Sequence, residues 1–192
     1  VLFALMGVQW RFAPAGSGGA ALTVGSWNLH NEHEQADAIR RVVESTGAEI
    51  GVMQEAIDNR FGPRFKGWQC DVEETQSICV RESSPWEIGR VATVQLGDSR
   101  RQAQAATLYS GSQRITVLNV HLVPGTRFGR PLAGLPRRLS DSLQMRRAQI
   151  ESIAQWARTV DGPFIIAGDF NTPPAEKIWE PLREVASDVF VH

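Results

Sequence analysis

Hydrophobic and polar positions follow two different periods at the amino-terminal end of the chain. Residues 22–29 alternate with a period of two, which predicts a strand. In residues 34–45 the apolar positions recur at helical spacing, and Gly47 stands where it can end a helix. Residues 48–53 form a second apolar run. The pattern therefore predicts a strand–helix–strand unit at the start of the domain.

The middle of the chain predicts short strands in an antiparallel arrangement. Glycine, serine and proline separate the apolar segments, and Ser110-Gly111-Ser112 is typical of a hairpin turn. Residues 123–139 contain three prolines and three glycines and predict a long loop. Loops of this length in compact domains are usually functional or mobile. The expected strands are residues 67–70, 77–81, 90–96, 103–109 and 114–122.

The carboxyl-terminal third predicts a helix, a buried strand and a shorter helix. Ser140 or Asp141 can cap a helix that continues to about residue 160 with one apolar face. The apolar run of residues 164–167 is bounded by turn formers and predicts a strand buried on both faces. A proline pair then introduces a helix over residues 175–185.

Length and composition set the class of protein. The chain has 192 residues, of which 42% are apolar and 21% charged, and this is ordinary for one globular domain. Helices flank a strand-rich centre, so we expect an α/β fold in which two packed sheets are covered by helices. The formal net charge of −1 argues against a bulk electrostatic nucleic-acid binder but allows a local basic patch. We expect a monomer.

Residues 1–12 are apolar and carry one charge, on Arg11. This segment is too short to span a bilayer, but it suits the end of a membrane helix with Trp10 and Arg11 at the interface. A first core strand and a disordered start are the alternatives. Residues 13–21 predict a linker, so the domain is expected over residues 22–192. A membrane tether would place this domain outside the cytoplasm; without one we expect a cytoplasmic protein.

Two cysteines, Cys70 and Cys79, flank a polar segment that resembles a turn. On a hairpin they would face each other across two strands, and a disulfide would form if the domain lies outside the cytoplasm. Two unrelated buried thiols are the alternative. Because no histidine is near them in the sequence, the two cysteines do not indicate a zinc site.

Polar side chains suited to metal or phosphate binding follow four of the expected strands. Asp169 and Asn171 are two residues apart, so they project to the same side where their strand leaves the sheet. Ligands collect at strand ends in layered α/β folds, which favours one shared cleft. For this pair alone, a simple turn that satisfies the local backbone is the alternative. The four strand ends carry Asn28, Glu55, Asn119 with His121, and Asp169 with Asn171.

These residue types fit phosphoester chemistry with a hard cation. Mg²⁺ prefers oxygen ligands and retains several waters, so one or two carboxylates and a substrate phosphate can hold it. Glu55 is the expected direct ligand, supported by the carboxamide oxygen of Asn28. His121 can donate to a phosphate oxygen or act as a general acid. Asp169 can orient and activate a water molecule, with Asn171 beside it.

Four motifs occur in order: Ser26-Trp27-Asn28, Gln54-Glu55, Asn119-Val120-His121 and Gly168-Asp169-Phe170-Asn171. In order and approximate spacing they resemble the endonuclease/exonuclease/phosphatase superfamily, the deoxyribonuclease I-like proteins, over about residues 23–190. The resemblance implies a four-layer αββα sandwich and phosphoester hydrolysis with Mg²⁺, or with Mn²⁺ as the alternative ion. It also implies metal binding at Asn28 and Glu55 and a catalytic set of His121, Asp169 and Asn171, in which we include Asn119.

The chain departs from this superfamily at its carboxyl end. Members close with a further strand or two and a Ser-Asp-His element, whereas this chain ends in Ser187-Asp188-Val189-Phe190-Val191-His192. We therefore expect a truncated or divergent member, whose sandwich lacks its last strands and has an exposed sheet edge. Because the Asp-His pair is absent, one expectation is that this chain has no phosphoesterase activity.

The expected long loop is basic. Arg127 and Arg130 lie in it with two further arginines, and residues 122–140 contain no Asp or Glu. Such a loop suits a polyanionic substrate, either nucleic acid or a phospholipid or inositol phosphate headgroup; a solvated loop is the alternative. We expect a metal-dependent phosphodiesterase with nuclease-like chemistry. A non-catalytic anion-binding module of the same fold and a membrane-tethered lipid-headgroup phosphatase are the alternatives.

Overall fold

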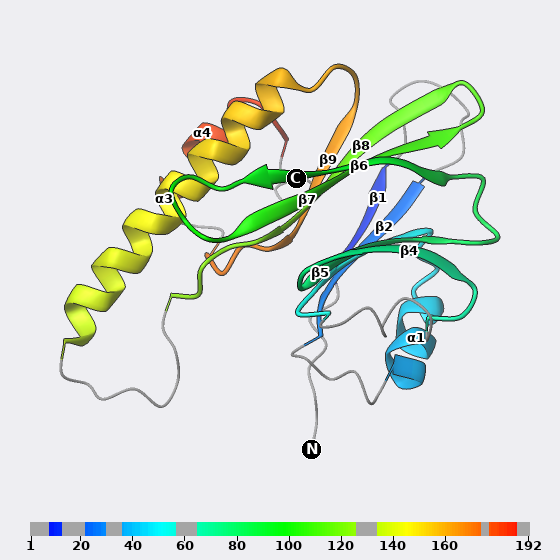
Figure 1. Ribbon diagram of the computed structural model, residues 1–192, viewed down its shortest axis with the longest axis horizontal. Coiled ribbons are helices and arrows are strands. Elements are labelled where there is room, and N and C mark those ends of the chain that lie inside the picture. The colour runs from blue at the N-terminus through cyan, green and yellow to red at the C-terminus, as the bar shows by residue number, and fades with distance from the viewer. Residues whose placement is uncertain are drawn as a thin grey trace.

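The structure, a computed structural model, describes residues 8–12, 22–29, 36–56, 65–125, 134–173 and 177–187. The strands of this part of the chain form two sheets that pack face to face (Figure 1). Sheet A has the spatial order β1 (Val8–Phe12), β2 (Leu22–Asn28), β3 (Ile50–Gln54), β5 (Gln76–Arg81) and β4 (Trp68–Glu73). Sheet B has the order β6 (Glu87–Gln95), β7 (Gln102–Ser110), β8 (Gln113–His121) and β9 (Phe164–Asp169).

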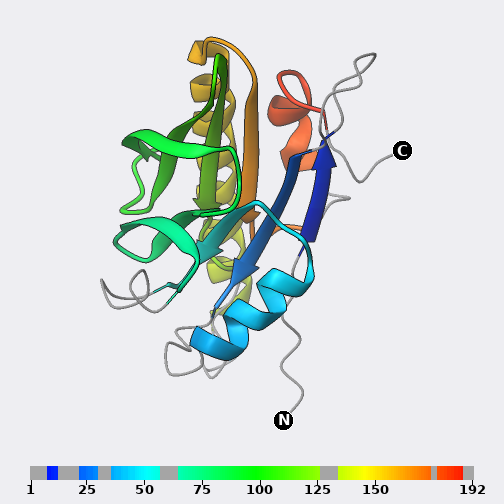
Figure 2. The same cartoon turned by 90° about the vertical axis from the view of Figure 1, so that its right-hand side faces the viewer.

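Helices cover the outer face of each sheet, which makes four layers in the order αββα (Figures 1 and 2). Helix α1 (Ala36–Ser45) packs on sheet A. Helix α3 (Leu135–Thr159), the 3₁₀ helix η2 (Lys177–Trp179) and helix α4 (Glu180–Arg183) cover sheet B. A third apolar cluster fills the space between the sheets. The expected α/β sandwich is confirmed.

The strand directions bring four strand ends to one edge of the sandwich. β2 runs parallel to β3, with Asn28 opposite Gln54, and β8 runs parallel to β9, with His121 opposite Asp169. Because side chains alternate along a strand, a polar residue four positions after an inter-sheet core residue shares its face. Asn28, His121 and Asp169 each stand four residues after such a core residue: Val24, Val117 and Ile165, respectively.

The start of the chain differs from the membrane-helix expectation. Val8–Phe12 forms β1, which pairs antiparallel with β2. These residues therefore form a first strand, which was one of the alternatives to a membrane helix. Residues 1–7 and the expected linker, residues 13–21, lie outside the described residues. None of the described helices has the length and apolar character needed to cross a membrane.

Helix α3 begins earlier than the sequence indicated. Gly134, in a left-handed conformation with φ of 73°, precedes the first turn, and no side chain caps the helix. Ser140 and Asp141 therefore lie inside the helix, so the expected caps were wrong. Pro136 was expected in a loop but lies in the first turn of the helix. Proline is tolerated there, because the N–H that it lacks would have no helical partner. Arg127 and Arg130 of the expected basic loop lie outside the described residues.

The last helical segment is also shorter than expected. The sequence predicted one helix over residues 175–185, whereas the structure has a 3₁₀ turn, Lys177–Trp179, followed by the single α-helical turn Glu180–Arg183. Residues 174–176 lie outside the described part of the chain. Ile178 and Leu182 are buried against sheet B, so the predicted inward face is retained although the regular helix is short.

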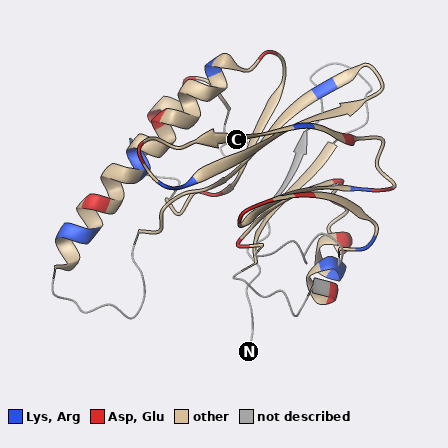
Figure 3. Ribbon diagram, viewed as in Figure 1, with Lys and Arg blue, Asp and Glu red and all other residues tan. Residues whose placement is uncertain are grey.

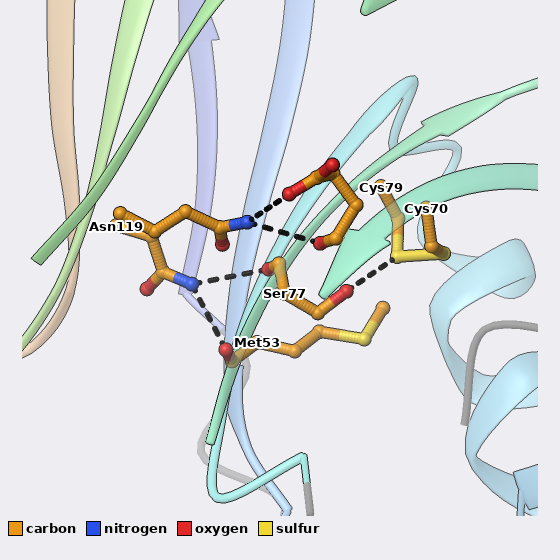
Figure 4. The surroundings of a disulfide bond; sticks show 7 residues. Met53, Cys70, Ser77, Cys79 and Asn119 are labelled. Carbon is orange, nitrogen blue, oxygen red and sulfur yellow. Dashed lines mark hydrogen bonds between the residues drawn. A yellow bond between two sulfur atoms is a disulfide. The ribbon is translucent and has the colours of Figure 1, made fainter. Parts of the chain in front are cut away.

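Cys70 and Cys79 form a disulfide between β4 and β5, where they are directly opposite each other (Figure 4). This decides between the two alternatives that the sequence left open. Cys79 is buried under α1 beside Trp68 and Val43, so the bridge belongs to the apolar layer between sheet A and its helix.

We predict that reduction of this disulfide lowers the free energy of unfolding by about 2–3 kcal/mol, because it releases a short closed loop in the unfolded chain. Urea unfolding with and without dithiothreitol measures the effect. A Cys70→Ala/Cys79→Ala double variant is the control and should not respond to the reductant. An unfolding midpoint of the wild-type protein that is the same under both conditions would contradict the prediction.

Candidate active site

Four side chains from four strand ends converge at the edge of the sandwich. Asn28 Nδ2 donates hydrogen bonds to Glu55 Oε1 at 3.2 Å and to Asp169 Oδ2 at 2.9 Å. His121 Nε2 lies 3.6 Å from the same Glu55 oxygen and 4.0 Å from the same Asp169 oxygen. Residues that are up to 141 positions apart in the sequence thus share one small polar centre.

Two of the site residues leave their strands through an unusual backbone conformation. Glu55 has a φ of 54° and Asn171 a φ of 50°, both in the left-handed region that side chains rarely adopt. At Glu55 this turn interrupts the alternation of β3, so its carboxylate is not forced to the face opposite Gln54. Strained conformations of this kind persist where the surrounding structure over-determines them, and they cluster at functional sites.

The Asp169–Asn171 turn combines both interpretations of its sequence. Asp169 Oδ1 accepts the backbone N–H of Asn171 at 2.9 Å, which is the local turn. Asp169 Oδ2 remains directed at Asn28 and His121. Asn171 Nδ2 donates to the carbonyl oxygen of Leu122 at 3.0 Å, so its side chain joins the exits of β9 and β8. One carboxylate oxygen therefore fixes the turn and the other faces the site.

Asn119 lies behind the site, between the two sheets (Figure 4). Its Nδ2 donates to the carbonyl oxygens of Met53 at 2.9 Å and Ser77 at 3.0 Å, and its Oδ1 accepts from Gln54 Nε2 at 2.7 Å. The side chain is 0% exposed, and these bonds use both amide protons and the oxygen. The sequence predicted a catalytic role for Asn119. In the structure, its hydrogen bonds join sheet B to sheet A behind Glu55 and His121.

A cavity of about 560 Å³ opens beside the polar centre. Glu55 and His121 line it on one side and Arg100 and Arg101 on another. Arg101 Nη1 donates to the carbonyl oxygen of His121 at 3.2 Å, whereas Arg100 is exposed to solvent. Neither arginine was among the site residues predicted from the sequence. An adjacent basic pair in the turn between two predicted strands was the signal that could have found them.

The donor set fits a hard divalent cation. Two carboxylates, Glu55 and Asp169, direct oxygens at one amide group, which compensates their charges only in part. A cation held by one or two carboxylates would compensate them more fully and could retain waters, as Mg²⁺ does. Within the described ranges no cluster of three or more His, Cys, Asp or Glu side chains could hold a metal ion. Such a cluster is not required for a site of this open type.

The sequence profile of the Endonuclease/Exonuclease/phosphatase family matches residues 25–177, which is most of the chain. The chain belongs to this family. The matched residues include all four strand ends of the site, and the family's name covers both nucleases and phosphatases, which hydrolyse phosphoesters. A search of curated proteins finds no match.

Solved structures with the deoxyribonuclease I-like fold superpose on this one. A TDP2 from D. rerio in complex with a single-strand DNA product has a TM-score of 0.64 and 15% identity, over 86% of this chain and 66% of that one. A humanized D. rerio TDP2 with 14 mutations has a TM-score of 0.63 and 17% identity, over 84% and 70% of the two chains. ANGEL2, a 2',3'-cyclic phosphatase in complex with adenosine-2',3'-vanadate, has a TM-score of 0.55 and 20% identity, over 77% and 47%.

These likenesses establish the fold. The chain spans about two thirds of the length of the TDP2 structures and about half that of ANGEL2.

Proposed function

We propose that this protein is a phosphodiesterase that depends on a divalent cation, with Mg²⁺ as the first candidate and Mn²⁺ as the second. The observation that carries the proposal is the convergence of Asn28, Glu55, His121 and Asp169 within one polar centre that borders a cavity. Membership of a family of nucleases and phosphatases supports the same reaction class.

Each side chain has a role that its geometry supports. Glu55 with Asn28 would hold the cation, whose chemistry is to polarise the phosphoryl group and stabilise its developing charge. Asp169 Oδ2, free of the local turn, orients and deprotonates the attacking water. His121 Nε2 faces the same centre and donates a proton to a phosphoryl oxygen or to the leaving group.

The cavity suits a phosphodiester substrate that carries further phosphate groups next to the scissile phosphate. Arg100 and Arg101 line it together with Glu55 and His121, so basic groups accompany the site. A guanidinium recognises phosphate oxygens through paired N–H donors. A nucleic-acid strand offers such phosphates next to the one that is cleaved, as does an inositol phosphate headgroup to a smaller extent. D. rerio TDP2 binds a single-strand DNA product in its structure, which supports the first of these substrates.

The test is hydrolysis by the full-length protein of bis-aryl phosphate, an oligonucleotide and a phospholipid, with Mg²⁺ or with EDTA. We expect turnover with Mg²⁺, loss with EDTA and recovery on adding metal. In a Glu55→Gln variant the Mg²⁺ concentration for half-maximal activity should rise at least about tenfold, because a carboxylate ligand is lost. The matched control is Glu87→Gln, at an exposed position of β6.

Identical Mg²⁺ dependence of wild type and Glu55→Gln would overturn the proposed metal role of Glu55. If the folded wild-type protein hydrolyses none of the substrates but binds inorganic phosphate, the anion-binding module of the same fold replaces the enzyme.

A further inference from the structure

A buried polar stripe on α3 faces the segments that carry the site. Ser142, Arg146 and Gln149 stand at positions i, i+4 and i+7, which places them on one side of the helix. All three side chains are buried. Acidic and basic residues also occur along this helix (Figure 3). Polar groups inside a protein need hydrogen-bond partners. For each of these side chains, a partner lies in a loop or turn next to the site.

Gln149 and Ser142 hold the segment that follows β8. Gln149 Oε1 accepts the backbone N–H of Val123 at 3.1 Å, and Ser142 Oγ donates to the carbonyl oxygen of Pro124 at 2.7 Å. Gln149 Nε2 also donates to Ser99 Oγ, at 3.0 Å, in the turn between β6 and β7. One helix face therefore ties together two borders of the cavity.

Arg146 holds the third segment, the exit of β9. Its Nη1 donates to the carbonyl oxygen of Asn171, and Gly125 leaves room for the guanidinium, since a Cβ there would lie 3.3 Å from Nη1. Arg146 is 7% exposed, and its Nε is buried without a hydrogen-bond partner. Among the residues that the structure describes, no carboxylate lies within ion-pair distance of it. Burying a cation costs free energy unless polar groups compensate it, and the hydrogen bond that the described residues provide for Arg146 is the one to the Asn171 carbonyl oxygen.

The Arg146 bond completes a set of three that fixes Asn171. The Asn171 N–H is bound to Asp169 Oδ1, its Nδ2 to Leu122 and its carbonyl oxygen to Arg146. These bonds hold Asn171 at a φ of 50°, a conformation that needs such support. Because the peptide unit is planar and rigid, a hydrogen bond that fixes the Asn171 carbonyl also fixes the backbone atoms adjacent to it.

We infer that Arg146 is a positioning residue: it holds Asn171 in its left-handed conformation and thereby aims Asp169 Oδ2 at the reacting water. This inference rests on the proposed function, in which Asp169 activates that water. A displacement of about 1 Å in such a group lowers the rate by about 10²-fold.

The test compares Arg146→Gln and Arg146→Lys with Arg147→Gln in the full-length protein. Arg147 is the exposed neighbour on the same helix and serves as the matched control. For bis-aryl phosphate at saturating Mg²⁺, we expect kcat of Arg146→Gln to fall by about 10²-fold with KM within about threefold. Arg146→Lys, which keeps the charge and one donor, should recover part of kcat, and Arg147→Gln should match wild type. A folded Arg146→Gln protein with wild-type kcat overturns the inference.

Hydrogen exchange of the Asn171 amide gives a second measurement that does not need turnover. We expect faster exchange in both Arg146 variants and wild-type exchange in Arg147→Gln, because Arg146 is hydrogen-bonded to the Asn171 carbonyl oxygen whereas Arg147 is exposed to solvent. If Arg146→Gln does not fold, Arg146→Lys decides by the same two measurements. If wild type hydrolyses nothing, the proposed function fails, and unchanged exchange in the Arg146 variants would in addition overturn the positioning role.

Discussion

Under the proposed function, we expect replacement of Asp169 with asparagine to lower kcat for phosphodiester hydrolysis by about 10²–10⁴-fold, the range for loss of a general base. The substitution keeps the size of the side chain and one oxygen that can accept the Asn171 N–H, so the local turn is retained. It removes the negative charge of the oxygen that lies 2.9 Å from Asn28 Nδ2 and 4.0 Å from His121 Nε2. The substitution therefore changes the carboxylate oxygen that faces the site and leaves the local turn in place. Steady-state kinetics at saturating Mg²⁺, with thermal unfolding in parallel, measure it.

Asp161→Asn is the matched control for this prediction. Asp161 lies shortly before the same strand, and its side chain is 95% exposed in a surface ion pair with Arg114. Exposed pairs of this kind contribute little, so we expect kcat within about twofold of wild type. The assignment of Asp169 as the base fails if Asp169→Asn retains wild-type kcat at saturating metal.

We expect replacement of Gly168 with alanine to destabilise the fold by about 3 kcal/mol or more, an overpacking effect at the upper end of the usual range. A Cβ at Gly168 would lie 2.0 Å from the carbonyl oxygen of Val120, and Gly168 has a φ of 140°. The obstacle is backbone of the paired strand β8, which cannot rotate away as a side chain can. For a chain of this size the loss corresponds to a fall in Tm of about 6–12 °C. Thermal and urea unfolding measure it.

Gly111→Ala separates the clash from the cost of the backbone conformation. Gly111 also has a positive φ, of 56°, but nothing lies within 4 Å of the position of its Cβ. We expect a destabilisation of about 1 kcal/mol, from the left-handed conformation alone. Equal losses for the two variants would show that the close approach of β9 to β8 is not what requires glycine at position 168.

The site motifs could be found in the sequence because each follows a strand. An apolar run that ends in a polar side chain indicates where a chain leaves a sheet, and Glu55, His121 and Asp169 were selected on this basis. The apolar face of α3 was visible for the same reason, since it repeats at helical spacing. The local pattern does not show the environment of each polar residue. Asn119 has the same local pattern as His121, yet it lies behind the site between the sheets.

Arg146 and Gln149 are polar residues whose burial the local sequence pattern does not indicate. On a helical wheel they flank the apolar face of α3. They are buried only because the segments after β8 and β9 cover them, and these contacts join positions that are 25 and 26 residues apart. A polar residue becomes buried through what folds over it, which no local pattern records.

The sequence by itself determined the order of the elements, the α/β class and the polar residues that end four strands, because these depend on the local alternation of apolar and polar side chains. Only the tertiary structure decided that β2 and β3, and β8 and β9, run parallel in a register that brings those ends together. It also decided the Cys70–Cys79 disulfide and the contacts of α3 with the site. Register, sheet packing and buried polar contacts join residues distant in the chain, so they are set by the closing of the sandwich as a whole.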